Sequence, residues 1–290
     1  MQDDLDRAVA KAESHMSLPG LKNGADRSRF LDRLRESTRA IDMLTRGDVD
    51  LAPAVTAPEK ILPIKQAYRL RRRDPEEAIW LAFLSTQVGW DRPASCEQLY
   101  GAFGSEPVWQ WARVRSDPQE FVQWLGSNYL KLRKVAPFGN HRKRETHKPG
   151  RGTPDTVRTY LELIGGSQVE FLRNRAAGDD PFDALYWAHD PVARFGRTAR
   201  YDFVRLLSNL GILESLGIGL VRPRHCYLAG ATGPLEGAKR MFGAGDPPKR
   251  QKSFWIDHLE QQCVRLSELV ACDLQAIEDA LCNWQKKGQS

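Results

Sequence analysis

The sequence has no long apolar run. No stretch approaches the roughly 20 apolar residues that a helix needs to cross a bilayer. The opening segment, MQDDLDRAVAKAESHM, is polar and acidic and has no apolar signal core. These absences argue against helical membrane spans and against a secretory signal peptide. We therefore expect a soluble protein located in the cytoplasm.

Cysteine and histidine are few and irregularly spaced. The five cysteines contain no C-x-x-C pair, and the six histidines contain no H-x-x-x-H pair. An odd number of scattered cysteines is typical of reduced thiols in a cytosol rather than of a disulfide framework. Because the spacing that zinc ligands usually show is also missing, we expect neither a metal nor a cofactor.

The sequence also lacks the period-two alternation that is typical of β-strands. The 290 residues are 41% hydrophobic, enough for one sizeable core or two modest ones. Apolar residues recur at a spacing of three to four, which predicts an all-α protein. The predicted helices are Glu76–Val88, which should be central and buried, Phe121–Leu132, Thr156–Ile164, Tyr201–Leu210, and Phe254–Trp284, the last divided near Cys272.

Prolines in the segment LAPAVTAPEKILP, residues 51–63, predict an irregular connection. We therefore divide the chain into an N-terminal helical segment, residues 1–60, and a larger helical region, residues 61–290. Neither region contains an internal repeat or a low-complexity tract.

Positive charge is concentrated in one segment. Lysine and arginine number 43 in the whole chain against 37 acidic residues, yet residues 131–151 contain eight of them and a single acid. Prolines and glycines in this segment predict a loop. The loop is either a solvated connector or a contact to a nucleic-acid backbone, for which Arg142, Lys143 and Arg144 are the candidates.

A glycine turn before a helix start, RFGRTARYD at residues 194–202, is a candidate anion site. The backbone N–H groups at a helix N-terminus attract anions, and three arginines surround this turn. The alternative is that Gly196 is only a helix cap and that the arginines are exposed.

Three further segments carry polar residues. Ser, Thr and Gln at positions 85–87 end a predicted helix, where they either face a ligand or bond back to helix carbonyls. Residues 222–240 contain three glycines, a composition found both in phosphate-binding loops and in structural turns, but without the Walker spacing. The adjacent carboxylates at 278–279 either orient arginines or form a solvated helical face.

Two of these segments, in this order, resemble the helix-hairpin-helix DNA glycosylases. AIWLAFLSTQVGWDRPASCEQLYGAFG, residues 78–104, is similar to the helix that carries their base-inserting residues. DPVARFGRTARYDFVRLLSNLGI, residues 190–212, is similar to their DNA-gripping hairpin. The sequence departs from them at residues 221–225, where VRPRH replaces V-D-T-H and its catalytic Asp, and no four-cysteine cluster follows. The resemblance implies an all-α, helix-hairpin-helix DNA-glycosylase-like fold, but without the usual catalyst of N-glycosidic cleavage.

A second resemblance covers more of the chain. RPRHCYLAGATGPLEGAKRMFG, residues 222–243, and DLQAIEDALCNWQKKG, residues 273–288, are similar to the α-glutamyl/putrescinyl thymine pyrophosphorylase family of bacteriophages, also called amino acid:DNA transferases. The latter segment also resembles the helical domain of the hydroxymethyluracil DNA kinases of the same pathway. The resemblance implies that a kinase places pyrophosphate on a hydroxymethyluracil base in double-stranded DNA. This enzyme then displaces the pyrophosphate with the amine of an amino acid, for which glycine suits a compact pocket. The pathway kinase is a candidate partner, and a phage-encoded chain would act in the host cytoplasm.

The implied reaction assigns roles to the candidates. Arginine forks stabilise the charge on a departing pyrophosphate, a carboxylate accepts the proton of the attacking amine, and the target base is flipped out of the duplex. The catalytic candidates are Asp202 as the general base, Arg197 and Gln87. The candidates for binding pyrophosphate are Arg200, Arg222, Arg224 and Lys239, and those for binding the substrate are Trp90, Tyr227 and Asp279. Asp279 is also the second choice of general base. Gly196 and Thr198 are further candidates for binding DNA.

Two alternatives stay open. One is a glycosylase of the same fold that acts on a modified base, against which the missing Asp counts. The other is a DNA-binding subunit without catalytic activity that presents DNA to the kinase. All three functions require phosphate contacts, so salt-sensitive DNA binding does not separate them.

Overall fold

The computed structural model describes residues 2–47, 63–88, 108–135 and 152–286. In these ranges the chain forms α-helices and two short 3-10 helices, and none of the residues lies in a β-strand. The all-α prediction is therefore confirmed. None of the helices in these ranges combines the length and the apolar character needed to span a bilayer.

The chain divides into two compact units. Unit 1 combines Met1–Asp42 with Arg222–Ser290, and unit 2 is Met43–Val221. Both terminal segments of the sequence therefore contribute to the same unit. The boundary that we predict after residue 60 lies outside the described residues.

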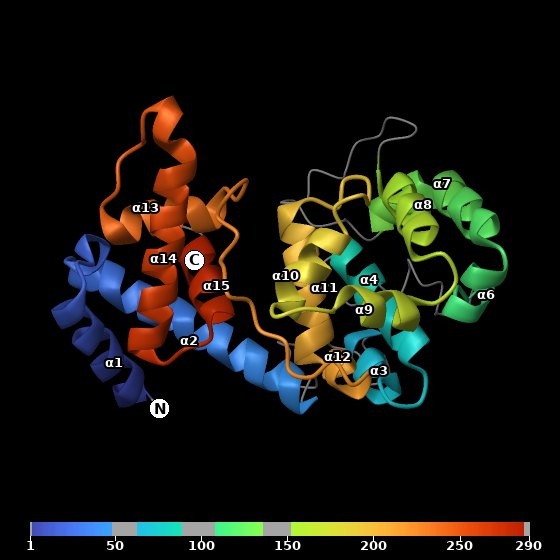
Figure 1. Cartoon of the computed structure of the whole chain (residues 1–290), viewed down its shortest axis with the longest axis horizontal. Coiled ribbons are helices and arrows are strands. Elements are labelled where there is room, and N and C mark those ends of the chain that lie inside the picture. The colour runs from blue at the N-terminus through green and yellow to red at the C-terminus, as the bar shows by residue number, and fades with distance from the viewer. Residues whose placement is uncertain (1, 48–62, 89–107, 136–151, 287–290) are drawn as a thin grey trace. The chain divides into compact units, whose positions relative to one another are not determined.

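Unit 1 is built from helices of both terminal segments (Figure 1). Helix α1 packs on α14, and α13 packs on α15. The predicted break near Cys272 is confirmed, because Ala271 ends α14 in the left-handed conformation and the Asp273 side chain caps α15. The elements are α1 (Gln2–His15), η1 (Pro19–Leu21), α2 (Gly24–Arg46, whose last turn belongs to unit 2), α13 (Gly233–Phe242), η3 (Lys249–Gln251), α14 (Lys252–Val270) and α15 (Leu274–Trp284).

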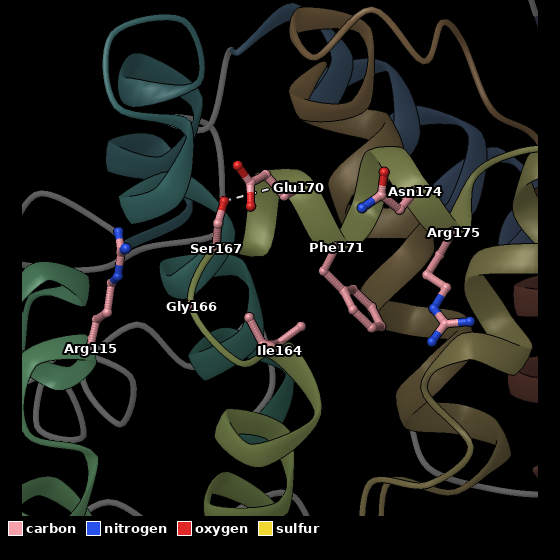
Figure 2. A pocket seen from close by; sticks show the side chains of 8 residues that line it. All are labelled: Arg115, Ile164, Gly166, Ser167, Glu170, Phe171, Asn174 and Arg175. Atoms are coloured by element: carbon pink, nitrogen blue, oxygen red, sulfur yellow. Dashed lines mark hydrogen bonds between the residues drawn. The ribbon is translucent and has the colours of Figure 1, made fainter.

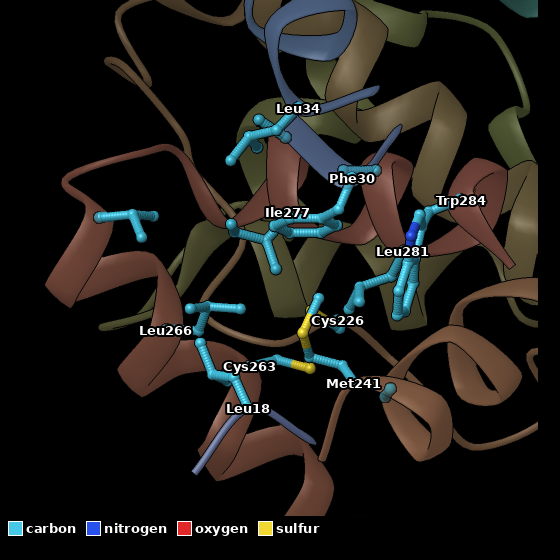
Figure 3. Packing of buried hydrophobic residues seen from close by; sticks show 14 of the residues in the cluster. Leu18, Phe30, Leu34, Cys226, Met241, Cys263, Leu266, Ile277, Leu281 and Trp284 are labelled. Carbon is cyan, nitrogen blue, oxygen red and sulfur yellow. The ribbon is translucent and has the colours of Figure 1, made fainter. Parts of the chain in front are cut away.

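The core of unit 1 is apolar and contains two cysteines. Figure 3 shows Cys226 and Cys263 side by side within it. A hydrogen bond with Cys263, together with burial, raises the pKa of the Cys226 thiol well above its ordinary value. Such a thiol stays protonated and unreactive. None of the four cysteines in the described ranges forms a disulfide, as the sequence predicts.

Unit 2 is organised around helix α4. This helix contacts α3, α6, α9, α11 and α12, and each of its residues from Ala78 to Leu84 is at most 1% exposed. The prediction of a central buried helix is therefore confirmed. The elements of unit 2 are α3 (Pro63–Leu70), α4 (Pro75–Val88), α6 (Trp111–Ser116), α7 (Pro118–Val135), α8 (Thr153–Ile164), α9 (Gln168–Arg175), α10 (Pro181–Ala188), α11 (Arg197–Asn209) and α12 (Ile212–Ser215).

A carboxylate at the start of α4 holds the start of α9. Glu76 accepts hydrogen bonds from Ser167 Oγ at 2.5 Å, from Gln168 N at 2.9 Å and from Val169 N at 3.2 Å. These donors include backbone N–H groups that a helix start leaves without intrahelical partners. The contact fixes α9 on the central helix.

Residues of α9, α11 and the turn between α10 and α11 form an aromatic cluster around a buried histidine. The His189 ring contacts Phe171, Phe195 and Phe203 with ring centroids 5.2–6.2 Å apart. Its Nδ1 lies 2.7 Å from the carbonyl oxygen of Leu185, and Nε2 has no hydrogen-bond partner in the described part of the chain. Burial lowers the pKa of His189 to about 4, so the ring is neutral near pH 7 and Nδ1 donates to the carbonyl.

Candidate functional site

The glycine turn of the sequence forms an open, basic helix start. Helix α10 is followed by a turn, and α11 begins at Arg197 with Gly196 as its N-cap. No side chain caps this end, and a Cβ at Gly196 would have no neighbour within 4 Å. Thr198 is exposed, whereas Arg197 is half-buried with its Cζ 4.9 Å from the ring centroid of Tyr201. The backbone at this turn can therefore be approached closely by an anion.

Arg200 is a buried residue that stabilises the turn. It is only 8% exposed, and its Nη1 lies 2.5 Å from Asp190 Oδ1, at the beginning of the turn. Its Cζ also lies 4.5 Å from the ring centroid of Tyr186 and 5.0 Å from that of Trp187. These contacts tie the end of α10 to α11. The sequence singles out Arg200 but not Asp190, because nothing local marks that aspartate as its partner.

Asp202, the first choice of general base, lies one turn inside α11. Its Oδ1 is 3.8 Å from Arg205 Nη2, and its side chain is 17% exposed. The carboxylate is therefore flanked by an arginine of its own helix.

The polar residues at the end of α4 bond back to their own helix. Ser85 Oγ donates to Leu81 O at 2.8 Å, and Thr86 Oγ1 donates to Phe83 O at 2.7 Å. Gln87 is 1% exposed, and its Nε2 donates to Phe83 O and to Thr86 Oγ1, each at 3.1 Å. Of the two interpretations of this segment, the structure therefore agrees with the one in which the side chains bond back to helix carbonyls. Trp90, which follows, lies outside the described residues.

The end of α4 nevertheless lies next to the turn. The ring centroid of Phe83 is 5.6 Å from that of Phe195, the residue before Gly196. The backbone carbonyl of Phe83 accepts the hydrogen bond of Gln87, whereas its ring contacts the turn. The DNA-binding candidates Arg142, Lys143 and Arg144 lie outside the described residues.

The remaining candidates belong to unit 1. Arg222 Nε lies 3.1 Å from Asp273 Oδ2, and Oδ1 of the same aspartate accepts from Gln275 N at the start of α15. Arg224 is exposed, and Asp279 is half-buried on α15. Five candidates therefore lie in this unit, namely Arg222, Arg224, Tyr227, Lys239 and Asp279, whereas Gln87, Gly196, Arg197, Thr198, Arg200 and Asp202 lie in unit 2.

Tyr227 occupies a left-handed backbone conformation, with φ of 50°. The amides on both sides of it, Cys226 N at 2.7 Å and Leu228 N, donate to the carboxylate of Glu260 on α14. A tyrosine rarely adopts this conformation, so the carboxylate offsets the strain by satisfying both donors. Sequence reasoning missed Glu260, since a single glutamate on a helix forms no pattern.

Two of the three glycines of the glycine-rich segment serve helix packing. Gly233 and Gly237 lie in α13 and face α15. A Cβ at Gly233 would lie 2.5 Å from Cys282 Sγ, and one at Gly237 would lie 2.3 Å from the carbonyl oxygen of Leu281. Only glycine permits this approach of the two helices, so these two glycines have a structural role, although within a helix and not in a turn.

Lys239, on the same helix, is bound by two carboxylates. Its Nζ lies 2.6 Å from Asp246 Oδ1 and 2.8 Å from Glu236 Oε1. These two hydrogen bonds raise the pKa of Lys239, and the bond with Asp246 has the larger effect. Two carboxylates therefore neutralise the positive charge of Lys239, which weakens its attraction for pyrophosphate.

The described residues contain no group of three or more His, Cys, Asp or Glu side chains that could hold a metal ion. The chemistry available in these ranges is that of arginines, carboxylates and backbone N–H groups. Such groups bind anions and accept protons.

The comparisons with known proteins give one match. The profile of the family "alpha-glutamyl/putrescinyl thymine pyrophosphorylase clade 3" matches residues 25–290, which include both the turn before α11 and the α13–α15 segment. Comparisons with curated proteins and with solved structures find no match. The match covers most of the chain and agrees with the resemblance seen in its sequence. This chain therefore belongs to the alpha-glutamyl/putrescinyl thymine pyrophosphorylase family, a family of enzymes that act in thymine modification.

Proposed function

We propose that this protein is an amino acid:DNA transferase of phage thymine hypermodification. It displaces pyrophosphate from 5-(pyrophosphoryloxymethyl)uracil in double-stranded DNA with the amine of a free amino acid. The observation that carries the proposal is the family match, which spans residues of both units. The excess of positive charge, 43 lysines and arginines against 37 acidic residues, suits a DNA substrate.

The start of α11 is the proposed DNA contact. Its uncapped N-terminus, the open space at Gly196 and the exposed Thr198 offer donors that a phosphate oxygen accepts. Together with α10 this arrangement supports a helix-hairpin-helix role, with Arg200 and Asp190 keeping the turn in shape. The target base must leave the duplex before its methylene group can react.

The proposed reaction is a substitution at the methylene carbon. The amine nitrogen forms a bond to this carbon while the carbon–oxygen bond to pyrophosphate breaks and the electron pair leaves with the pyrophosphate. The nitrogen then loses a proton, for which Asp202 is the proposed acceptor because it lies one turn from the helix start. Arg197 is the proposed stabiliser of the departing charge.

The decisive test uses DNA whose hydroxymethyluracil has been pyrophosphorylated by the pathway kinase. This DNA is incubated with the protein and a mixture of amino acids, digested to nucleosides and analysed by mass spectrometry. A new nucleoside that contains one amino acid would support the transferase and identify its substrate. A free base with an abasic site would instead establish a glycosylase, and unchanged DNA would leave a binding role.

A pair of arginine variants tests the site. Arg197→Ala should lower turnover much more than DNA affinity, because the charge it stabilises develops in the transition state. Arg72→Ala, an exposed arginine of the same unit away from the turn, should change neither. Equal losses of turnover and affinity in Arg197→Ala would reduce this residue to a backbone contact.

A further inference from the structure

A pocket that the sequence does not indicate lies in unit 2 between α6, α8 and α9 (Figure 2). Its volume is about 530 Å³, within the range of small-molecule sites. The residues that matter for its chemistry are Arg115, Ile164, Glu170, Phe171, Asn174 and Arg175.

The pocket carries charges of both signs. Figure 2 shows Arg115 and Arg175 on opposite sides, with Glu170 and Asn174 between them. In the described part of the chain none of the three charged side chains forms an ion pair. All three are exposed to solvent. Two cationic groups and one anionic group are thus available to a ligand.

The apolar floor of the pocket consists of Ile164 and Phe171. Ile164 is 7% exposed and Phe171 is 9% exposed. The Cζ of Arg175 lies 5.6 Å from the ring centroid of Phe171. The backbone N–H of Glu170 donates to Ser167 Oγ at 3.1 Å, and this hydroxyl in turn donates to Glu76 Oε1 at the start of α4. The backbone position of Glu170 is therefore set by the fold.

The charge pattern selects among ligands. Inorganic phosphate or pyrophosphate would be attracted by the arginines but repelled by Glu170. A molecule with a carboxylate at one end and an ammonium at the other matches both signs. An α-amino acid has these two groups on one carbon, and its side chain can lie over the apolar floor.

We propose that this pocket binds a free α-amino acid as its zwitterion, an identity that rests on the proposed function. The ammonium group lies against Glu170, and the carboxylate lies against Arg115. The guanidinium of Arg115 reaches the pocket edge, because a Cβ at Gly166 would lie 3.9 Å from its Nη2. Arg175, placed over Phe171, meets the ligand's side chain. With two positive groups against one negative group, the pocket favours neutral and acidic amino acids over lysine and arginine.

Ring contacts connect this pocket to the proposed DNA contact. Phe171 on the pocket floor lies 5.4 Å from the ring centroid of His189, which lies 6.2 Å from that of Phe195. Phe195 precedes Gly196, the N-cap of α11. An amino acid bound here lies over Phe171, which belongs to the same aromatic cluster as Phe195.

The test measures binding without catalysis. The full chain is titrated with each common amino acid by isothermal calorimetry, alone and with duplex DNA that lacks pyrophosphate. We expect saturable binding that weakens at least tenfold in Glu170→Gln and in Arg115→Gln and is unchanged in Arg72→Gln. All these side chains are exposed, so the variants should keep the wild-type circular dichroism spectrum. Failure of every amino acid to bind under both conditions overturns the proposal.

A titration with inorganic pyrophosphate distinguishes an amino-acid site from an anion site. Removal of the Glu170 charge weakens binding of a zwitterion, because its ammonium loses a partner, but strengthens binding of an anion. If pyrophosphate binds and Glu170→Gln tightens it while no amino acid binds, the site is an anion site and the proposal is wrong.

The same variants separate this proposal from the proposed function. Transfer of an amino acid to DNA that is unaffected by Glu170→Gln and Arg115→Gln would refute the pocket and leave the transferase intact. Amino-acid binding that both substitutions abolish, with no transfer to pyrophosphorylated DNA, would support the pocket and refute the transferase.

Discussion

Lowering the pH from 7 to 4 is expected to destabilise the protein through His189. Its pKa is lowered from 6.5 to about 4, mainly by burial, with the charge of Arg200 acting in the same direction and the hydrogen bond to Leu185 O opposing it. The folded protein therefore takes up this proton less readily than the unfolded chain. The contribution of His189 to the free energy of unfolding is complete above pH 6.5 and is lost between pH 6.5 and about 4. The loss amounts to about 3 kcal/mol over this interval.

The assay compares wild type with His189→Phe, which cannot take up a proton. Urea unfolding is followed by tryptophan fluorescence at several pH values from 7 to 4. At pH 7 the variant should be less stable by about 1 kcal/mol, because it lacks the hydrogen bond to Leu185 O. The difference should shrink as the pH falls and change sign before pH 4, since the wild type alone loses the histidine contribution.

All other titrating groups are common to the two proteins, so the change in their difference reports His189. His258→Gln, which alters an exposed histidine, serves as the control and should follow the wild type at every pH. A difference between wild type and His189→Phe that stays constant from pH 7 to pH 4 would refute a neutral histidine in the aromatic cluster.

Three further predictions concern packing, and thermal or urea unfolding measures each. Gly237→Ala should lower the free energy of unfolding by about 3 kcal/mol or more, because its Cβ would lie 2.3 Å from the carbonyl oxygen of Leu281. The matched change Gly126→Ala, in an exposed helical position with no neighbour within 4 Å, should instead raise it by about 0.5–1 kcal/mol, and equal effects would contradict the α13–α15 packing. Ala271→Gly should raise it by up to about 1 kcal/mol, since Ala271 has φ of 51°; a loss would mean that its methyl group is needed. Glu76→Ala should lower it by about 3 kcal/mol, because buried donors lose their acceptor, and an unchanged stability would show that water replaces the carboxylate.

The elements that the sequence predicts well are those governed by local interactions. Helix α4 is found because an unbroken apolar stretch follows Asp74-Pro75, a standard helix start. The break between α14 and α15 is found because Asp273 is a good N-cap at the point where the apolar pattern changes. The basic turn before α11 is also found, since Gly196 and its arginines are adjacent in sequence.

The elements that the sequence does not predict depend on contacts between distant residues. Glu76 binds Ser167 across 91 positions, and nothing near either residue announces this contact. Gly233 and Gly237 have the composition of a phosphate loop, and only the position of α15 shows that they serve helix packing. The charged pocket is missed for the same reason, because Arg115 and Glu170 lie on helices that meet only in the folded unit.

The division of unit 1 between the two terminal segments has a consequence for biosynthesis. On the ribosome, α1 and most of α2 are made before unit 2, but Phe30 of α2 packs against Trp284, which follows unit 2 in the sequence. Unit 2 is continuous in sequence, so it can collapse while unit 1 still waits for its second half. During this interval the apolar faces of α1 and α2 are open to chaperones or to a neighbouring nascent chain. A messenger cut after the codon for Val221 would encode all of unit 2 and leave these faces permanently uncovered, so its product should aggregate or be degraded.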